Sequence, residues 1–403
     1  MTVSDPYASL GVRRRVNAAG ALTRLGGAVM APEVVEAMAA ASRASVDIGE
    51  LQDAASRRIA EATGAEAGLV TTGAAAALTL AAAASIARWD VAKMAALPHV
   101  AADILLPRTH RTGYAHALAA SGARLVDIGH NDRGTGAGVR GLEAWEIEAA
   151  LSPSVVAVGF SANANSIVDL PAVAAVCRAN GLPLIVDAAA QLPPKENLKR
   201  FIAMGADLVA FSGGKALGGP QASGILAGRR DLVASALLQQ LDMDVAPQTW
   251  SPPRLIDRAN LRGVPHHGIG RGFKAGKEEI VGLLTALDRF VKADDAADNA
   301  RLEARLKAIA AGLNGHAVTL VSASVTGRVP VLEIAVPDAL ALSARLQQGD
   351  PPVHLSERHA SRGVLTLDPQ VLLPEHDAPL TEALRAALSW RGLTPTPRSS
   401  LSS

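Results

Sequence analysis

Short apolar runs alternate with helical patterns between residues 68 and 212, and this alternation restricts the possible folds more than any other feature of the chain. No hairpin signal joins one run to the next, and helical patterns such as YAHALAASG and DLPAVAAVCRANG separate them. Strands that alternate with helices form a mostly parallel sheet covered on both faces. Ligands of such sheets bind at the carboxyl ends of the strands. The predicted strands are 68–72, 103–107, 123–129, 155–161, 182–188 and 206–212.

The character of the chain changes after residue 246. Residues 246–272 are rich in Pro, Gly and Arg, which predicts an exposed connection. Apolar residues at helical spacing then predict one long connecting helix over 277–312, followed by a small domain with mixed strands. We therefore predict a large domain over 14–265, a small C-terminal α/β domain over 266–395 that includes this helix and an N-terminal arm over 1–13, and a disordered tail over 396–403.

Composition excludes several classes of function. The 39 Lys+Arg and 38 Asp+Glu residues give a net charge of +1, and only 3% of the 403 residues are aromatic. This balance does not favour a nucleic-acid partner. The uncharged stretch 68–87 consists mostly of Ala, Gly, Ser and Thr, so we interpret it as a strand and a buried helix rather than a membrane span. The single cysteine, Cys177, lies in an apolar helical pattern and fits a core position and a reducing, cytoplasmic location.

One lysine has an unusual sequence context. The stretch FSGGKALGGPQASG (211–224) surrounds Lys215 with five glycines directly after a predicted strand, and the strand LPLIVD ends in Asp187. A lysine amine bonds covalently to the aldehyde of pyridoxal phosphate, and an aspartate keeps the pyridine nitrogen of that cofactor protonated. We expect the glycines to let the flat cofactor approach the backbone. The sequence therefore predicts a pyridoxal phosphate site built on Lys215 and Asp187.

The same hypothesis needs groups that hold a phosphate and cover the ring. Thr72, Gly73, Ala74 and Ala75 open an apolar helix, whose N-terminal N–H groups can bind a dianion, and Ser212 is a candidate hydroxyl donor. His110 follows another predicted strand and can stack on the ring. The histidines show no metal-ligand spacing, so we expect no metal.

Long ordered motifs across nearly the whole chain resemble a known family. They include VNAAGALTRLGG (16–27), TGAEAGLVTTGAAAAL (63–78), RTHRTGYAHALAASGARLVDIG (108–129) and VDAAAQLPPKENLKRFIAMGADLVAFSGGKALGGPQASGIL (186–226). These motifs resemble the fold-type I pyridoxal phosphate enzymes of the L-seryl-tRNA selenium transferase family, and most of all the shorter branch that includes D-glucosaminate-6-phosphate ammonia-lyase. The resemblance implies a seven-stranded sheet between helices.

The resemblance also implies roles for individual residues. Lys215 would carry the cofactor, Asp187 would contact the ring nitrogen, Thr72 to Ala75 would bind the phosphate and His110 would lie on the ring face. Asn163 would reach the phenolic oxygen of the cofactor, and Arg271 would cross an interface of a homodimer or larger oligomer. The transferases carry an N-terminal domain for tRNA, whereas the VNAAG motif here begins at residue 16. Gln191 stands where relatives often have a glutamate, which bears on the identity of the substrate.

These residues leave more than one reaction open. The leading hypothesis is a lyase in which Lys215 removes the Cα proton of a hydroxylated amino acid or amino-sugar acid, His110 protonates the leaving β-hydroxyl, and a keto acid and ammonia result. Reprotonation by His110 or Tyr114 would instead give a racemase or epimerase, and retro-aldol cleavage is a third possibility. A relative that binds the cofactor without turnover is a fourth. Arg358, or Arg362 in its place, is the candidate clamp for a substrate carboxylate.

Overall fold

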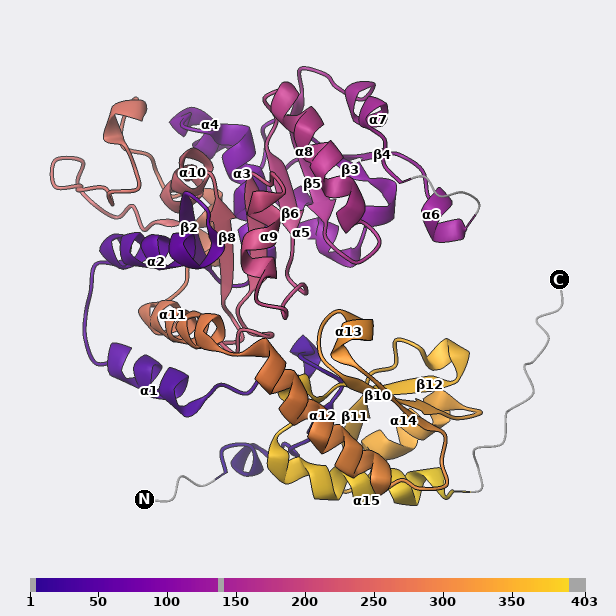
Figure 1. Ribbon diagram of the computed structural model, residues 1–403. Helices are drawn as coiled ribbons and strands as arrows, with labels where there is room; N and C mark the ends of the chain where they lie inside the picture. The colour runs from indigo at the N-terminus through magenta and orange to yellow at the C-terminus, as the bar shows by residue number, and fades with distance from the viewer. Residues whose placement is uncertain (1–4, 137–140, 391–403) are drawn as a thin grey trace. The chain divides into compact units, whose positions relative to one another are not determined.

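The computed structural model describes residues 5–136 and 141–390 and divides the chain into two units (Figure 1). Unit 2 is Met30–Lys292, and unit 1 joins Met1–Val29 to Ala293–Ser403. The predicted boundary at 265/266 therefore differs from the structural one. The reason is that helix α11 (Lys277–Lys292) buries Ile280, Leu283 and Leu287 in the core of unit 2.

The central sheet of unit 2 has seven strands in the order β2-β8-β7-β6-β5-β3-β4. All of them run parallel except β8, which is antiparallel to both of its neighbours. The mostly parallel sheet is thus confirmed, and β8 is the strand that the sequence pattern missed. The strands are β2 Ala67–Thr71, β3 Asp103–Pro107, β4 Arg124–Ile128, β5 Val155–Ser161, β6 Leu184–Asp187, β7 Leu208–Ser212 and β8 Gly224–Gly228.

Helices cover both faces of this sheet (Figure 1). One face packs against α3 (Ala74–Ala87), α4 (Val91–Ala96), α5 (His116–Ala119) and α10 (Arg230–Gln240). Thirteen of the residues of α3 are buried, and most of them are alanines, which allow a helix to approach a sheet closely. The other face packs against α2 (Ile48–Thr63), α7 (Ala144–Glu148), α8 (Leu170–Ala179), α9 (Asn197–Ala203) and α11.

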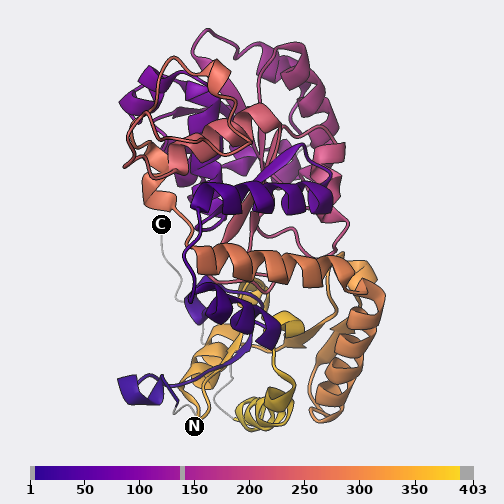
Figure 2. The same ribbon diagram turned by 90° about the vertical axis from the view of Figure 1, so that its left-hand side faces the viewer.

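The predicted single helix over 277–312 is wrong. The chain breaks between α11 and α12 (Asp295–Ala311), because the Asp294 side chain accepts hydrogen bonds from the backbone N–H groups of Ala296 and Ala297 and begins a new helix. Figure 2 shows α1 (Pro32–Ala41) lying along α11. A Cβ at Gly282 of α11 would come within 2.6 Å of Met38 Cγ, so this glycine is what allows the close contact.

Unit 1 has its own core on a small antiparallel sheet. The sheet order is β12-β10-β9, and a separate parallel pair joins β1 (Val16–Ala18) to β11 (Val353–Leu355). Leu306, Leu342 and Leu380 come from the covering helices and are fully buried. The remaining elements are β9 Val318–Val321, β10 Val331–Ala335, β12 Val364–Leu367, α13 Ala323–Thr326, α14 Ala339–Gln348 and α15 Asp377–Leu388.

Some predictions fall outside these elements. The tail over 396–403 lies outside the described residues. Among the helices that are described, none has the length and hydropathy needed to cross a bilayer. The stretch 68–87 forms β2 and the buried helix α3, as predicted.

Candidate active site

The carboxyl-end edge of the unit 2 sheet gathers the predicted polar residues. Thr71 ends β2, Ser161 ends β5, Asp187 ends β6 and Ser212 ends β7, and these strands all run in the same direction. Parallel strands place their carboxyl ends at one edge. The residues singled out from separate motifs therefore lie along one side of the sheet.

Asp187 presents an enclosed carboxyl at this edge. Burial raises its pKa, while a hydrogen bond from the Ala189 N–H to Oδ1 (3.0 Å) and the positive charge of Lys215 lower it. A further positive charge or hydrogen-bond donor at this carboxyl would favour its ionised form. A protonated pyridine nitrogen is a group of that kind, so Asp187 fits the predicted contact.

Lys215 lies on a tightly folded connection between β7 and β8. The Gly213 N–H donates to the Ser223 carbonyl (2.8 Å), and the Gly218 N–H donates to the Lys215 carbonyl (2.9 Å). A Cβ at Gly213 would lie 2.1 Å from Ser223 Oγ, and one at Gly214 would lie 2.6 Å from Gln221 Cα. The expectation that these two glycines make room for a cofactor is therefore wrong, because the returning chain fills that space. Their effect is to hold the Lys215 backbone in place.

His110 is buried beside Asp187. Both residues line a small cavity together with Tyr114, Phe160 and Ser161. The His110 ring meets Phe160 edge to face, with ring centroids 4.5 Å apart, and Nδ1 accepts a hydrogen bond from the Ser161 N–H (3.2 Å). Burial lowers the pKa of His110 to about 4, against a smaller opposing effect of the Asp169 charge. At neutral pH His110 is therefore uncharged, with its proton on Nε2.

The N-terminus of α3 fits a phosphate group. Gly73 has a φ of +122°, no side chain caps this helix, and a Cβ at Gly73 would meet no atom within 4 Å. Open space thus lies next to the first backbone N–H groups of the helix, which carry the positive end of the helix dipole. The enclosed Asp187, the neighbouring charge of Lys215 and this helix end together satisfy what pyridoxal phosphate needs from a protein.

Other predicted residues are engaged in local structure. Asn163 Oδ1 accepts from the N–H groups of Asn165 and Ser166, which folds the turn after β5. The Thr72 hydroxyl donates to the Phe273 carbonyl (3.3 Å), and Gln191 contributes its carbonyl to Asn197. Arg271 forms an ion pair with Asp242. The cofactor or substrate contacts of these residues stay predictions, as does that of the exposed Tyr114.

Arg358 belongs to unit 1 and is exposed. Its charge acts on Asp368, whose pKa burial raises and the nearby guanidinium groups lower. The sequence analysis did not single out Asp368, on which the charges of both Arg358 and Arg328 act. Asp368 follows a strand in GVLTLD just as Asp187 ends one in LPLIVD, and this shared pattern is the signal that could have found it. Arg328 stands in a polar loop with no such signal.

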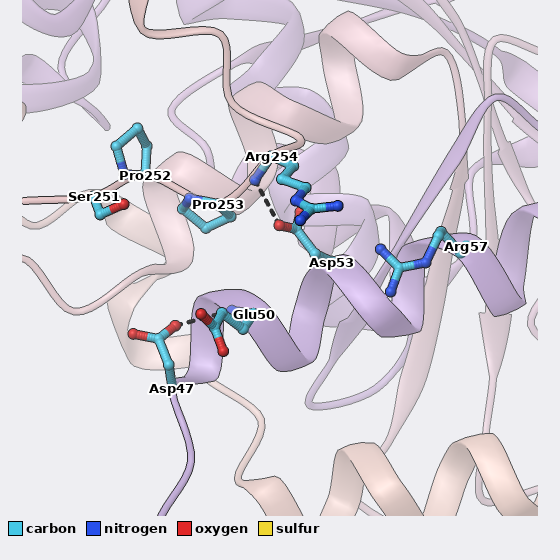
Figure 3. A pocket seen from close by; sticks show the side chains of 8 residues that line it. All are labelled: Asp47, Glu50, Asp53, Arg57, Ser251, Pro252, Pro253 and Arg254. Carbon is cyan, nitrogen blue, oxygen red and sulfur yellow. Dashed lines mark hydrogen bonds between the residues drawn. The ribbon is translucent and has the colours of Figure 1, made fainter.

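A separate concave surface of unit 2, with a volume of about 490 Å³, lies between α2 and residues 251–254 (Figure 3). Its central carboxylate, Asp53, accepts hydrogen bonds from the backbone N–H groups of Arg254 and Leu255, and Asp47 caps the N-terminus of α2 through the Glu50 N–H (2.9 Å). Both carboxylates therefore already accept hydrogen bonds from backbone N–H groups and have a structural role. None of the residues that line this surface lines the cavity at Asp187.

Comparison with known proteins agrees with this geometry. Residues 157–244, which contain both Asp187 and Lys215, match the family model described as "L-seryl-tRNA selenium transferase". The chain is 29% identical over 94% of its length to D-glucosaminate-6-phosphate ammonia lyase of Salmonella typhimurium, covering 96% of that protein. It is 30% identical over 97% of its length to 5'-C-glycyluridine monooxygenase-decarboxylase of a Streptomyces species, covering 94% of it. It is 30% identical over 87% of its length to L-seryl-tRNA(Sec) selenium transferase of Hyphomonas neptunium, covering 79%.

Solved structures agree as well. A structure of D-glucosaminate-6-phosphate ammonia-lyase matches with a TM-score of 0.77 and 27% identity, covering 96% of this chain and 98% of the other. Serine palmitoyltransferase of Sphingomonas wittichii matches with a TM-score of 0.53 at 14% identity, over 90% of this chain and 84% of the other, which shows the shared fold alone.

The fold and the site thus define a fold-type I pyridoxal-phosphate-dependent enzyme. The chain belongs to the L-seryl-tRNA selenium transferase family. Its cofactor is pyridoxal phosphate, as the Lys215–Asp187 pair predicted.

Proposed function

We propose that the protein is a lyase that converts a hydroxylated amino acid or an amino-sugar acid into a keto acid and ammonia. The observation that carries the proposal is the placement of Lys215 and Asp187 at one sheet edge, in a chain similar along most of its length to an enzyme named as an ammonia lyase. The Cα–H and β-C–O bonds break and the amino nitrogen leaves as ammonia. The hydroxyl leaves as water, and hydrolysis later consumes one water, so the overall reaction balances.

Each residue has a defined task in this proposal. Bound pyridoxal phosphate supplies an electron sink for the substrate Cα. Lys215 Nζ, in its uncharged form, accepts the Cα proton. The effect of the Lys215 charge on Asp187 supports a position of this side chain near that carboxyl. Asp187 holds positive charge at the ring nitrogen, and the first N–H groups of α3 hold the phosphate. Asn163, Ser212 and Gln191 complete the proposed contacts with cofactor and substrate.

The state of His110 changes one step of the sequence-based hypothesis. A histidine with a pKa of about 4 is uncharged at neutral pH, so it has no spare proton to give to a leaving hydroxyl. With Nδ1 occupied by the Ser161 N–H, its Nε2–H is the donor that remains. We therefore assign His110 to the ring face as a neutral hydrogen-bond donor. In the lyase, the proton that Lys215 removes from Cα is then the source for the departing hydroxyl.

A racemase is the second candidate. Tyr114 lines the same cavity as His110 and Asp187 and is 65% exposed, so its hydroxyl is available as a second proton donor. Return of a proton to the opposite side of Cα would invert the substrate without loss of nitrogen. Retro-aldol cleavage, which would need a β-hydroxyl and release an aldehyde, is the third.

The deciding experiment is a substrate screen in heavy water. D- and L-amino acids and amino-sugar acids, including D-glucosaminate 6-phosphate, would be incubated with the holoenzyme and followed by mass spectrometry. A keto acid with an equal amount of ammonia supports the lyase. Deuterated substrate of both configurations without keto acid means a racemase, and release of an aldehyde means aldol cleavage. Loss of carbon dioxide from the substrate would contradict all three.

We further propose that the enzyme works as a homodimer or a larger oligomer in the cytoplasm, with Arg271 contributing to the site of a neighbouring copy. The single buried Cys177, whose pKa burial raises to about 12, suits a reducing compartment. Subunit mixing tests the shared site. Lys215→Ala and Arg271→Ala chains, each inactive alone, would regain up to about a quarter of the activity when mixed if their residues meet at one site. No recovery in confirmed mixed oligomers would rule the shared site out.

A further inference from the structure

A buried hydrogen-bond network of unit 2 covers the outer edge of strand β2. This strand stands at the end of the sheet order, so its outward backbone groups need partners other than β8. The side chain of Gln52 on α2 pairs with Val70 as a neighbouring strand would. Its Oε1 accepts from the Val70 N–H (3.1 Å), and its Nε2 donates to the Val70 carbonyl (2.9 Å). One turn further along α2, Ser56 Oγ accepts from the Gly68 N–H (3.1 Å).

Gln240, the last residue of α10, extends this network to Phe273. Its Oε1 accepts from Gln52 Nε2 (3.3 Å). Its own Nε2 donates to the carbonyls of Val70 (3.3 Å) and Phe273 (3.0 Å). Each of these partners has a second hydrogen bond, because Gln52 Nε2 also donates to Val70 and the Thr72 hydroxyl also donates to Phe273. Loss of the buried Gln240 amide would therefore leave none of them unpaired, and we expect the fold to tolerate it.

The Phe273 carbonyl connects the network to the turn that opens α3. The Thr72 hydroxyl donates to this carbonyl (3.3 Å), and Thr72 directly precedes Gly73. A hydroxyl has a single proton, so in this arrangement Thr72 does not also donate to a phosphate oxygen. The turn packs against β8 as well, because a Cβ at Gly224 would lie 2.3 Å from the Gly73 carbonyl carbon and 2.6 Å from the Ala74 nitrogen. These contacts restrict the position of the first backbone N–H groups of α3.

We propose that Gln240 is a positioning residue for the cofactor phosphate. Through the Phe273 carbonyl and the Thr72 hydroxyl, it holds the turn whose N–H groups bind that phosphate. The inference rests on the proposed place of the phosphate at the N-terminus of α3, but not on the lyase reaction. N–H groups that already point at an anion bind it more tightly, because less conformational freedom is lost on binding. Thr72 would then act on the turn, which differs from the direct phosphate contact that the sequence motif predicts.

A role confined to the edge of β2 is the competing explanation. In that case, loss of the Gln240 amide would destabilise the fold and would weaken every ligand of the site to the same extent. A positioning role for the phosphate would weaken only ligands that carry a phosphate. Pyridoxal has the ring and the aldehyde of the cofactor but no phosphate, so a comparison of the two compounds separates the explanations.

The test titrates the full-length protein, stripped of cofactor, with pyridoxal phosphate and with pyridoxal, and follows binding by visible absorbance. Gln240→Met keeps the length of the side chain and removes its hydrogen bonds. It should weaken the binding of pyridoxal phosphate about tenfold and that of pyridoxal less than about twofold, as expected when one hydrogen bond to the phosphate site is lost. Gln239→Met is the matched control, because Gln239 is buried on the same helix and its Nε2 donates to the Ser235 carbonyl within that helix (3.3 Å). This control should leave both affinities unchanged.

Substitutions of Thr72 test the route from Gln240 to the turn. Thr72→Val keeps the branched shape and removes the hydroxyl, so it should weaken pyridoxal phosphate as Gln240→Met does. Thr72→Ser keeps the hydroxyl and should retain most of the affinity. Because both residues act on one carbonyl, the variant that combines Thr72→Val with Gln240→Met should lose less affinity than the product of the two single losses. Losses that multiply in full would mean that Thr72 acts independently of Gln240, and would overturn the proposed route.

The ratio of the two affinities decides the proposal. An equal loss for both compounds in Gln240→Met, or no loss for either, would overturn it. Melting temperature and circular dichroism check that each variant folds. Should Gln240→Met unfold, Gln240→Asn draws the amide back from Phe273 by one carbon and takes its place, with the same expected ratio. A wild type that binds pyridoxal as tightly as pyridoxal phosphate would contradict the phosphate site at α3 itself. No substrate is used, so these results are independent of the screen that tests the lyase.

Discussion

The two units each place an aspartate at the carboxyl end of a strand, and the two carboxyls have different partners. Asp187 ends β6 in unit 2, and Asp368 follows β12 in unit 1. Each accepts a hydrogen bond at Oδ1 from the backbone N–H two residues further on, Ala189 in one case and Gln370 in the other. Burial raises the pKa of both. The same local device, an aspartate that caps its own turn, therefore appears in a parallel and in an antiparallel sheet.

What differs is the cation that each carboxyl meets. The charge of a lysine amine acts on Asp187, and two guanidinium groups act on Asp368. An amine can lose its proton and take up another, so it can do chemistry, whereas a guanidinium stays charged and can only bind. The amine beside Asp187 is thus the group suited to proton transfer, whereas the guanidinium groups that act on Asp368 are suited only to binding or structure.

Substitution of Lys215 should have the largest effect on activity. Lys215→Ala removes the only group assigned to both cofactor attachment and proton transfer, so activity should fall about a thousandfold or more. The visible absorption band of lysine-bound cofactor should disappear with it. Lys199, an exposed lysine of α9, is the control, and Lys199→Ala should leave both unchanged. An unchanged absorption band in Lys215→Ala would falsify the entire assignment of the site.

Asp187 gives the next largest effect. Asp187→Asn keeps the cap on Ala189 but removes the charge that we propose faces the ring nitrogen, so kcat should fall about a hundredfold, or roughly 3 kcal/mol of barrier. Steady-state kinetics on the saturated holoenzyme would measure it. Asp90→Asn is the control, because Asp90 also caps a helix, α4, and has no proposed contact with the cofactor. A kcat within twofold of the wild type would show that Asp187 is only a cap.

A substitution at Gly20 tests how closely its turn packs against Asp368. Its φ is +77°, and an added Cβ would meet the Asp368 carboxylate, so Gly20→Ala should lower the free energy of unfolding by about 2–3 kcal/mol. Gly315, with a φ of +90° and open space around it, isolates the backbone term. Gly315→Ala should cost only about 1 kcal/mol. If urea unfolding showed the same loss of free energy of unfolding in Gly20→Ala and Gly315→Ala, the Gly20 turn would not be packed closely against Asp368.

His110 provides the smallest of these effects, and it depends on pH. Its pKa is about 4 in the folded protein, below the ordinary value of 6.5. The neutral ring therefore stabilises the fold above pH 6.5, and this contribution is lost as the pH falls towards 4. Between pH 7.5 and pH 5 the wild type should lose about 2 kcal/mol more of its free energy of unfolding than His110→Gln. Parallel curves for the two proteins would show that His110 is not held neutral.

The fold and the two central residues could be predicted because they depend on local patterns. Apolar runs separated by helical patterns predicted the parallel sheet, and a strand-end Asp187 with the SGGK motif predicted the cofactor. The break at Asp294 carried a signal too, since aspartate is a strong N-cap, but the apolar spacing on both sides hid it. Strand β8 was missed because its sequence, GILAG, is bounded by glycines.

The sequence by itself determined the class of sheet, the edge at which polar residues collect, and the lysine and aspartate that are predicted to hold the cofactor, because each depends on a short local motif. Only the tertiary structure decided which contacts those residues make. It showed that Gly213 and Gly214 pack against their own loop, that burial lowers the pKa of His110 while its Nδ1 accepts from the Ser161 N–H, and that the turn at Gly20 lies against the Asp368 carboxylate. The burial of a side chain and the charges around it depend on segments that lie far apart in the chain. A local sequence pattern therefore does not predict which of these segments come into contact.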